Sequence, residues 1–289
     1  MGIRIITDSG SDIKQETAKD WGIRVLPMPV WFGKEEYLDD VTLTADELYM
    51  RMVDTGELPR TKAVAVSDYE KAFADAEEAG DAVICIAMSS GMSACYRNAC
   101  AAAEKYGEKV AVIDSLNVCA SQHALVRYAL GMVGTGKTFD EVVHRLERDK
   151  KRLHVISLVD TLDYVYMGGR LSFFSRFTGN LLRLKPIITA DEDGKVRIIT
   201  KAQGQKNGFR MFSELVEEAG GIDFSMPVCM HYSGLSDGNM RDFMKQEAAL
   251  FEGQENHVHV MQFGTTVGTY SGPGAFAIGF FHRRIASFM

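Results

Sequence analysis

Residues 82–103 read AVICIAMSSGMSACYRNACAAA, and the class of fold can be inferred from them. They begin with an apolar run from Ala82 to Met88, which is typical of a strand buried on both faces of a parallel sheet. The polar turn Ser89-Ser90-Gly91 follows, and Ser93 to Ala103 then reads as a helix. These residues therefore predict a strand, a loop and a helix in the order that α/β folds repeat.

Units of the same kind lie on both sides. Short runs rich in β-branched residues occur at Ile3 to Ile6, Val110 to Ile113 and Leu153 to Val159, and polar residues follow each run. Apolar residues recur at helical spacing from Asn117 to Val133. Residues 1–155 are therefore predicted to form an N-terminal α/β domain with a Rossmann-like parallel sheet and crossover helices.

The pattern changes after about residue 155. Two runs, Pro186 to Thr189 and Val196 to Thr200, flank Asp193-Gly194, which is a hairpin signal. Strands at Val228 to His231 and His257 to Phe263 bracket a helical stretch. Residues 156–289 are predicted to form an α+β domain with a mixed sheet. Because no repeat or Pro/Ser-rich linker intervenes, we expect the two domains to pack closely around a cleft.

Composition narrows the class of protein. Acidic residues outnumber basic ones by 39 to 32 and no Lys/Arg-rich stripe occurs, which argues against a nucleic-acid-binding surface. Five cysteines without CxxC spacing favour a reducing compartment, and we expect a cytoplasmic protein. We expect no signal peptide and no membrane span, because the chain becomes acidic at once and no apolar run approaches ~18 residues.

Polar loops follow the predicted strands at the edge where open α/β sheets bind ligands. These loops are Thr7-Asp8-Ser9, Ser89-Ser90-Gly91, Asp114-Ser115 and Asp160-Thr161. Ser93 lies where a loop turns into a helix, so the neighbouring backbone N–H groups are placed to face an anion such as a carboxylate. For any one of these residues a turn or cap role is the simpler interpretation, but together they favour a ligand site.

Gly131-Met-Val-Gly-Thr-Gly136-Lys137-Thr138 satisfies the phosphate-binding P-loop pattern. A P-loop follows a strand, whereas a predicted helix precedes this stretch. Thr138-Phe-Asp140-Glu141 then forms a capping box, whose carboxylates would repel phosphate. We interpret the segment as a helix–turn–helix.

Gly91-Met-Ser93-Ala-Cys95 approaches the nucleophile elbow of serine hydrolases, so an esterase or thioesterase using Ser93 stays an alternative. The second Gly of that motif is Cys95 here, and His231 is the one candidate base. We interpret His231 as a strand-terminal histidine held by hydrogen bonds. His257-Val-His259 lacks a third ligand, so no metal is predicted.

The sequence resembles the DegV family over nearly its whole length. The resemblance rests on short motifs whose order and spacing are specific: Thr7-Asp8-Ser9 with Asp12, Pro59-Arg-Thr61, Ser89-Ser90-Gly91-Met92-Ser93 with Tyr96, Asp114-Ser115, Asp160-Thr161-Leu162-Asp163-Tyr164, Gly168-Gly169-Arg170-Leu171, Lys185-Pro186-Ile187-Ile188 and Gly272-Pro273-Gly274-Ala275. Members bind long-chain fatty acids, and in the best understood role they carry the lipid for a bacterial fatty acid kinase.

The resemblance implies a binding protein without catalytic residues or cofactors, whose ligand is a fatty acid such as palmitate held between the domains. Thr61 and Ser93 match the family's carboxylate contacts, with Ser89, Ser90, Gly91 and Ser115 expected nearby. The resemblance also implies that Arg170 contributes to docking of a kinase subunit, and an ion pair within the protein is the alternative.

The head-group end departs from the family pattern. Tyr270 stands where the family has His, and a phenol donates a hydrogen bond but does not become cationic near neutral pH. Because of these departures, a regulatory role without lipid stays open. We also expect an apolar stripe on a helix after Arg170 to act as a lid or portal near a membrane surface. The alternative is that these side chains pack in the core. The residues concerned are Phe173, Phe174, Phe177, Leu181 and Leu182.

Overall fold

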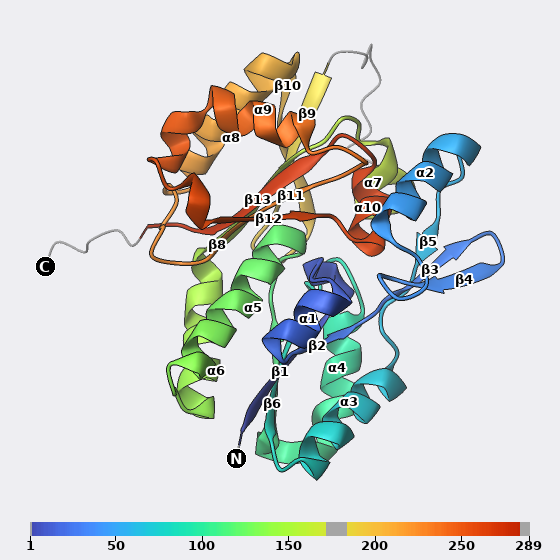
Figure 1. Cartoon of the computed structure of the whole chain (residues 1–289), viewed down its shortest axis with the longest axis vertical. Helices are drawn as coiled ribbons and strands as arrows, with labels where there is room; N and C mark the ends of the chain where they lie inside the picture. Colours follow the sequence, from blue (N-terminus) through green and yellow to red (C-terminus); the bar gives the residue numbers. More distant parts are fainter. Residues whose placement is uncertain (1, 172–183, 284–289) are drawn as a thin grey trace, which may run out of the picture.

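The computed structural model of the chain describes residues 2–171 and 184–283. Its first sheet is parallel, with the order β2-β1-β6-β7 (Figure 1). The strands are β1 (Ile3–Asp8), β2 (Arg24–Leu26), β6 (Ala82–Ala87) and β7 (Val110–Asp114). All six residues of β6 are buried, as expected for a strand covered on both faces. The α/β class predicted from the sequence is confirmed.

Helices cover both faces of the parallel sheet. The buried faces of α3 (Val66–Glu78) and α4 (Cys95–Ala103) pack on one side, around Phe73. On the other side lies α5 (Cys119–Gly134), followed by α6 (Phe139–Asp149). The short helix α1 (Gln15–Trp21) connects β1 to β2.

The second sheet is mixed, with the order β10-β9-β8-β13-β11-β12. Its strands are β8 (Leu153–Leu158), β9 (Leu184–Ala190), β10 (Val196–Gln203), β11 (Val228–Tyr232), β12 (Val258–Gln262) and β13 (Phe276–Phe281). The predicted hairpin is present as the antiparallel pair of β9 and β10. Helices α8 (Gln205–Glu218) and α9 (Gly238–Gln246) pack on its outer face.

One predicted strand belongs to a different sheet. The sequence places Leu153 to Val159 in the parallel sheet, but β8 lies in the mixed sheet and pairs antiparallel with β13 and β9. An apolar run reports burial and not the identity of its neighbours, and β13 follows more than a hundred residues later. Residue 155 lies inside β8, and the division of the chain into domains at that residue stays a prediction.

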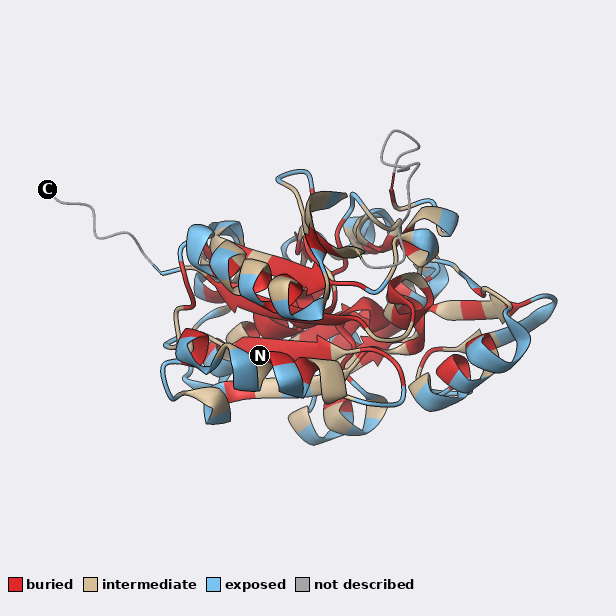
Figure 2. Cartoon of the chain, turned by 90° about the horizontal axis from the view of Figure 1, so that it is seen from above, coloured by how far each residue is buried: buried red, intermediate tan, exposed pale blue. Residues whose placement is uncertain are grey.

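Helix α5 lies between the two sheets and contributes to one core that both share. This core contains Ile84 of the parallel sheet, Leu125 of α5 and Ala277 of the mixed sheet. At its tightest point β13 passes the start of α5, where a side chain on Gly279 would overlap the backbone of Ala120. Figure 2 shows the buried residues concentrated in these central layers, with exposed residues on the outer faces of the helices.

A small third sheet, of order β4-β3-β5, was not predicted from the sequence. Its strands are β3 (Pro29–Phe32), β4 (Glu35–Leu38) and β5 (Arg60–Thr61). It packs with α2 (Ala45–Thr55), which begins at a capping box formed by Thr44 and Glu47. Since β5 ends at Thr61, this sheet positions a predicted site residue.

Two short helices complete the surroundings of the site: α7 (Asp163–Met167) and α10 (Thr265–Ser271). The remaining short segments are 3-10 helices: η1 (Ser9–Ser11), η2 (Glu104–Lys109), η3 (Lys150–Arg152), η5 (Ala248–Phe251) and η6 (Glu255–His257). Among the described residues, no helix combines the length and apolar character needed to cross a membrane. The predicted apolar lid lies outside the described residues.

Candidate functional site

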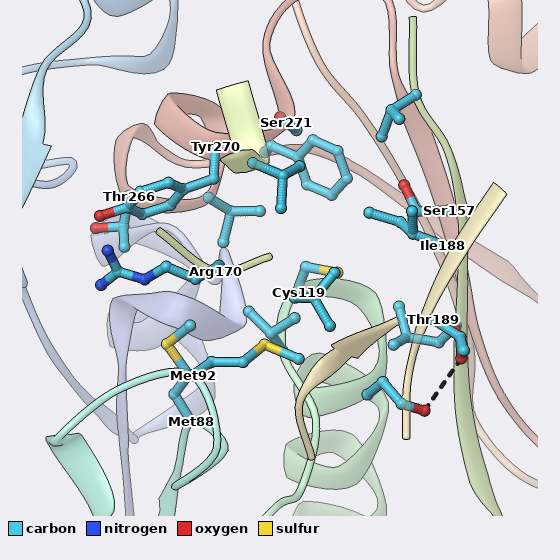
Figure 3. Close-up of a pocket in the computed structure, with 18 residues that line it drawn as sticks. Met88, Met92, Cys119, Ser157, Arg170, Ile188, Thr189, Thr266, Tyr270 and Ser271 are labelled. Atoms are coloured by element: carbon cyan, nitrogen blue, oxygen red, sulfur yellow. Dashed lines mark hydrogen bonds between the residues drawn. The ribbon is translucent and has the colours of Figure 1, made fainter. Parts of the chain in front are cut away.

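An apolar cavity lies between the two large sheets (Figure 3). About 700 Å³ of space, open solvent at its mouth included, lies between its walls. The loop after β6, the start of α5, the strands β8, β9 and β10, and α10 all contribute to its wall. The lining residues include Met88, Met92, Val118, Cys119, Val155, Val159, Val165, Ile188, Ala190, Val196, Phe263 and Val267.

Two hydroxyl groups in the wall are engaged with the protein backbone. Ser157 Oγ donates to the carbonyl of Phe276 at 3.1 Å, and Thr189 Oγ1 donates to the carbonyl of Val155 at 2.6 Å. With these groups satisfied, the wall presents mainly carbon and sulfur. Unbranched methionine side chains adapt easily to a flexible apolar ligand. The lining therefore suits an apolar ligand.

Thr61, Tyr270 and Arg170 meet at one side of this cavity. The hydroxyls of Thr61 and Tyr270 are 2.5 Å apart, and the Arg170 guanidinium carbon lies 4.4 Å from the centre of the Tyr270 ring. Arg170 and Tyr270 also line a second, more polar cavity, together with Thr61 and Arg60. The phenol and the guanidinium thus stand between the apolar cavity and a polar one. Figure 3 shows them across the apolar cavity from Thr189.

The glycine after α7 provides the space for the Tyr270 ring. A side-chain carbon on Gly168 would overlap the edge of that ring. The carbonyl of Gly168 also accepts a hydrogen bond of 2.6 Å from Arg170 Nη1. The Gly168-Gly169-Arg170 sequence therefore fixes both partners of the contact between Arg170 and Tyr270.

Ser93 lies in the loop before α4, next to Met92 of the cavity wall. Its Oγ accepts a hydrogen bond of 3.3 Å from the backbone N–H of Cys95 and lies 3.3 Å from the Cys95 sulfur. The segment after Thr61 is joined to α4, because Asn98 Nδ2 donates to the carbonyl of Val64 at 2.8 Å. Thr61 is therefore hydrogen-bonded to Tyr270. The segment that follows it is held to α4, the helix that begins after Ser93.

Ser89 and Gly91 contact the turn between β9 and β10. Ser89 Oγ donates to the carbonyl of Gly194 at 2.6 Å. A side-chain carbon on Gly91 would lie 2.6 Å from the carbonyl oxygen of Asp193, so the close approach of the two loops requires glycine. These residues hold the hairpin against the parallel sheet, and neither lines the apolar cavity.

Ser90 and Ser115 also make local contacts. The Ser90 N–H donates to Asp114 Oδ1 at 3.2 Å, and Ser115 Oγ donates to the carbonyl of Asn117 at 2.9 Å. A direct role of these two residues in ligand binding stays a prediction.

His231, the candidate base of the esterase alternative, is fully buried at the end of β11. Its Nδ1 lies 2.8 Å from Asp12 Oδ2, and its Nε2 lies 3.2 Å from His123 Nδ1. Both ring nitrogens are therefore engaged, and the hydrogen bonds described for Ser93 go to Cys95. The prediction that hydrogen bonds hold His231 in place is confirmed. Its Asp12 partner was missed because 219 residues separate them.

The interpretation of Gly131 to Thr138 as a helix–turn–helix is confirmed. The segment continues from α5 and ends at the capping box of α6, in which Thr138 and Glu141 exchange hydrogen bonds. His257 is exposed, and no group of three or more metal-binding side chains occurs in residues 2–171 and 184–283.

Comparisons with known proteins agree on one family. A family model described as an uncharacterised protein of the DegV family matches residues 2–283. A DegV domain-containing protein from Caldanaerobacter subterraneus subsp. tengcongensis is 32% identical over 281 residues, covering 96% of this chain and 98% of that protein.

Solved structures of the same architecture are similar to this chain. One is described as DegV, a fatty acid binding protein from Bacillus subtilis, with a TM-score of 0.82, 25% identity, and coverage of 98% of this chain and 100% of that one. Another describes fatty acid binding of a DegV family protein from Thermus thermophilus, with a TM-score of 0.87, 24% identity and the same coverage.

Proposed function

This chain belongs to the DegV family, and from that premise we propose that it binds a long-chain fatty acid such as palmitate. The acyl tail would occupy the apolar cavity between the predicted domains, residues 1–155 and 156–289. The observation that carries the proposal is an apolar cavity between the two large sheets with a hydroxyl pair at its side. The fatty-acid-binding descriptions of the Bacillus and Thermus proteins support it.

Thr61 and Tyr270 are the proposed carboxylate contacts, with Ser93 as a third. The hydroxyls of Thr61 and Tyr270 already lie within hydrogen-bonding distance of each other, so a carboxylate oxygen can replace that bond with two donors. The Arg170 guanidinium beside the ring adds a positive charge on the side of the polar cavity. The head group would therefore face the polar cavity.

The tail should supply most of the affinity. Transferring ~14 methylenes at ~0.8 kcal/mol each gives an upper bound of ~11 kcal/mol. One hydrogen bond contributes only ~1–3 kcal/mol when its loss leaves a partner unsatisfied. Head-group residues would thus set orientation more than retention.

We propose further that the chain performs no chemistry and presents the carboxylate to a separate kinase subunit, with Arg170 contributing to docking. Arg170 is partly exposed at the polar cavity, which supports a place near such a partner. Transient contact with a membrane would allow the acid to be loaded. An assay with a bacterial fatty acid kinase subunit tests this step: wild-type protein should support acyl phosphate formation, and Arg170→Ala should reduce it without losing bound acid.

Native mass spectrometry of protein purified from a bacterial host tests the binding role. We expect one added mass per chain that matches a fatty acid and leaves on solvent extraction, and stoichiometric uptake of added palmitate by the extracted protein. Extracted, folded protein that takes up no fatty acid would contradict the proposal. Covalent labelling of Ser93 by a fluorophosphonate, with turnover of acyl esters, would instead support the esterase alternative.

A further inference from the structure

Three imidazoles from both halves of the chain meet next to the apolar cavity: His123 and His231 are fully buried, and His259 is half-buried. His123 of α5 lies between His231 of β11 and His259 of β12, with ring centres 5.2 and 5.0 Å away. Trp21 packs against His123 and His259 at 5.6 and 5.9 Å. We call His123, His231 and His259 the histidine cluster.

The packing of this cluster suits neutral rings. His123 Nε2 and His259 Nε2 are buried and have no hydrogen-bond partner among the described residues. A second proton on the cluster would place like charges about 5 Å apart in a medium of low polarity, which is strongly unfavourable.

The charged groups around the cluster reinforce this preference. Burial lowers the pKa of His123 and of His259, and the positive charge of Arg127 on α5 lowers both further. Asp12 is the carboxyl group that contacts the cluster, and the negative charge of Asp39 disfavours its ionised form. Cys229 lies two residues before His231 on β11. Burial raises the pKa of its thiol to about 12, so this thiol stays neutral beside the cluster.

Two contacts connect the cluster to the cavity. The ring of Phe263, which lines the cavity, lies 5.9 Å from the ring of His231. Asp12 Oδ1 accepts a hydrogen bond of 2.9 Å from the N–H of Gly264, the residue at the start of α10. Helix α10 carries Tyr270 and contributes Thr266 to the cavity wall.

We propose that proton uptake by the histidine cluster weakens the Asp12–Gly264 hydrogen bond at the start of α10. The binding of an apolar ligand in the adjacent cavity would weaken with it. This inference rests on the proposed lipid-binding function and adds a dependence on pH to it. The ligand would be retained at neutral pH and released more readily in mildly acidic conditions.

Binding should weaken as the pH falls, because the loosened state takes up protons more readily than the folded state. Burial lowers the pKa of His259 to about 4 and that of His231 to about 3, and lowers that of His123 well below its usual range. A loosened state regains the ordinary histidine pKa of ~6.5. The stabilisation is therefore complete above about pH 6.5 and declines as the pH falls from there towards 4. Burial raises the pKa of Asp12, so this group acts in the opposite direction to the histidines.

The test uses the methyl ester of cis-parinaric acid, an uncharged fluorescent probe whose head group does not titrate. Its Kd is measured from pH 7.5 to 5.5 on the full chain. We expect the Kd to rise about three- to tenfold for wild type, since a histidine with a lowered pKa changes the equilibrium by at most ~tenfold per pH unit.

Two substitutions remove two of the three titrating rings of the cluster and leave His231 in place. His123→Asn keeps a polar group near His231, and His259→Phe keeps a ring against Trp21 and replaces an unpartnered nitrogen. The double variant should bind the probe at pH 7.5 and show a clearly smaller rise in Kd by pH 5.5 than wild type, because only His231 of the cluster still titrates. His144→Gln, an exposed position on α6, is the matched control and should behave as wild type.

Urea unfolding of the same proteins provides a readout that needs no ligand. Between pH 6.5 and 5 the unfolding equilibrium constant of wild type should change more steeply than that of His259→Phe, by up to ~tenfold per pH unit. A probe Kd that is independent of pH in wild type, or equally pH-dependent in the double variant, would overturn this inference alone. Failure to bind at pH 7.5 would instead overturn the proposed function, and this inference with it.

Discussion

The hydroxyl of Thr61 lies 2.5 Å from that of Tyr270, although 209 residues separate the two in the chain. Thr61 ends the last strand of the small sheet, and Tyr270 lies on α10 between α2 and α7. The pairing of a residue from the first quarter of the chain with one near its end places hydrogen-bond donors beside the apolar cavity.

Tyr270→Phe tests the head-group contact. The ring stays against Arg170 and Gly168, while one donor to the carboxylate is lost, so palmitate affinity should fall by about 1–3 kcal/mol, roughly 5- to 150-fold. Affinity for methyl palmitate should change little. Isothermal titration with both ligands measures the difference, and Tyr37→Phe, at a half-buried position on β4 that does not line the cavity, is the control. An equal loss for acid and ester would contradict the assignment.

Gly168→Ala should displace the Tyr270 ring, because the added carbon overlaps it. We expect the Thr61–Tyr270 hydrogen bond to break and bound fatty acid to exchange faster with vesicles, by about an order of magnitude. Gly131→Ala is the matched control, since Gly131 lies in α5 with open space around its Cα. Alanine there should stabilise the fold by about 0.5–1 kcal/mol. Unchanged exchange in Gly168→Ala would show that the ring does not control access.

Ser93→Ala should weaken retention of palmitate modestly, by about 1 kcal/mol or roughly fivefold. The loop should stay formed, because the Ser93 hydroxyl is partly exposed and bonds only locally to Cys95 among the contacts described. Competition between labelled and unlabelled palmitate measures the change. Complete loss of lipid from folded protein would contradict a dominant role of the tail.

Gly279→Ala should destabilise the whole chain. The added carbon would overlap the backbone of Ala120, which side-chain rotation does not relieve. We expect a loss of about 1–3 kcal/mol in the free energy of unfolding, measured in urea. Gly131→Ala serves again as the control, and a midpoint equal to wild type would indicate that β13 and α5 can move apart at little cost.

Much of the fold could be predicted from local pattern. The run from Ala82 to Met88 and the hairpin around Asp193-Gly194 carry strong signals of burial and of a turn. Sheet membership could not be predicted in the same way, because pairing joins distant segments. For this reason β8 was placed in the wrong sheet, and the strands of the small sheet, with few residues each, were missed.

Part of the candidate site could be predicted, from the family resemblance and not from local sequence pattern. Thr61 and Tyr270 were singled out through the family resemblance, and the structure brings their hydroxyls together. The contact of Arg170 with the Tyr270 ring was not predicted, since it depends on the space at Gly168. Nor could the Asp12–His231 pair be predicted, because neither residue has a local signal that points to the other.

The position of α5 has a consequence for how a ligand exchanges. Because Leu125 and its neighbours belong to one core with both large sheets, pulling the sheets apart as rigid bodies would expose that core to water. Unfolding should therefore be cooperative across the predicted domain boundary, and a fragment ending at residue 155 should not be stable alone. Entry and exit of an acyl chain would proceed through small displacements at the edge, around Tyr270, while the central layers stay closed.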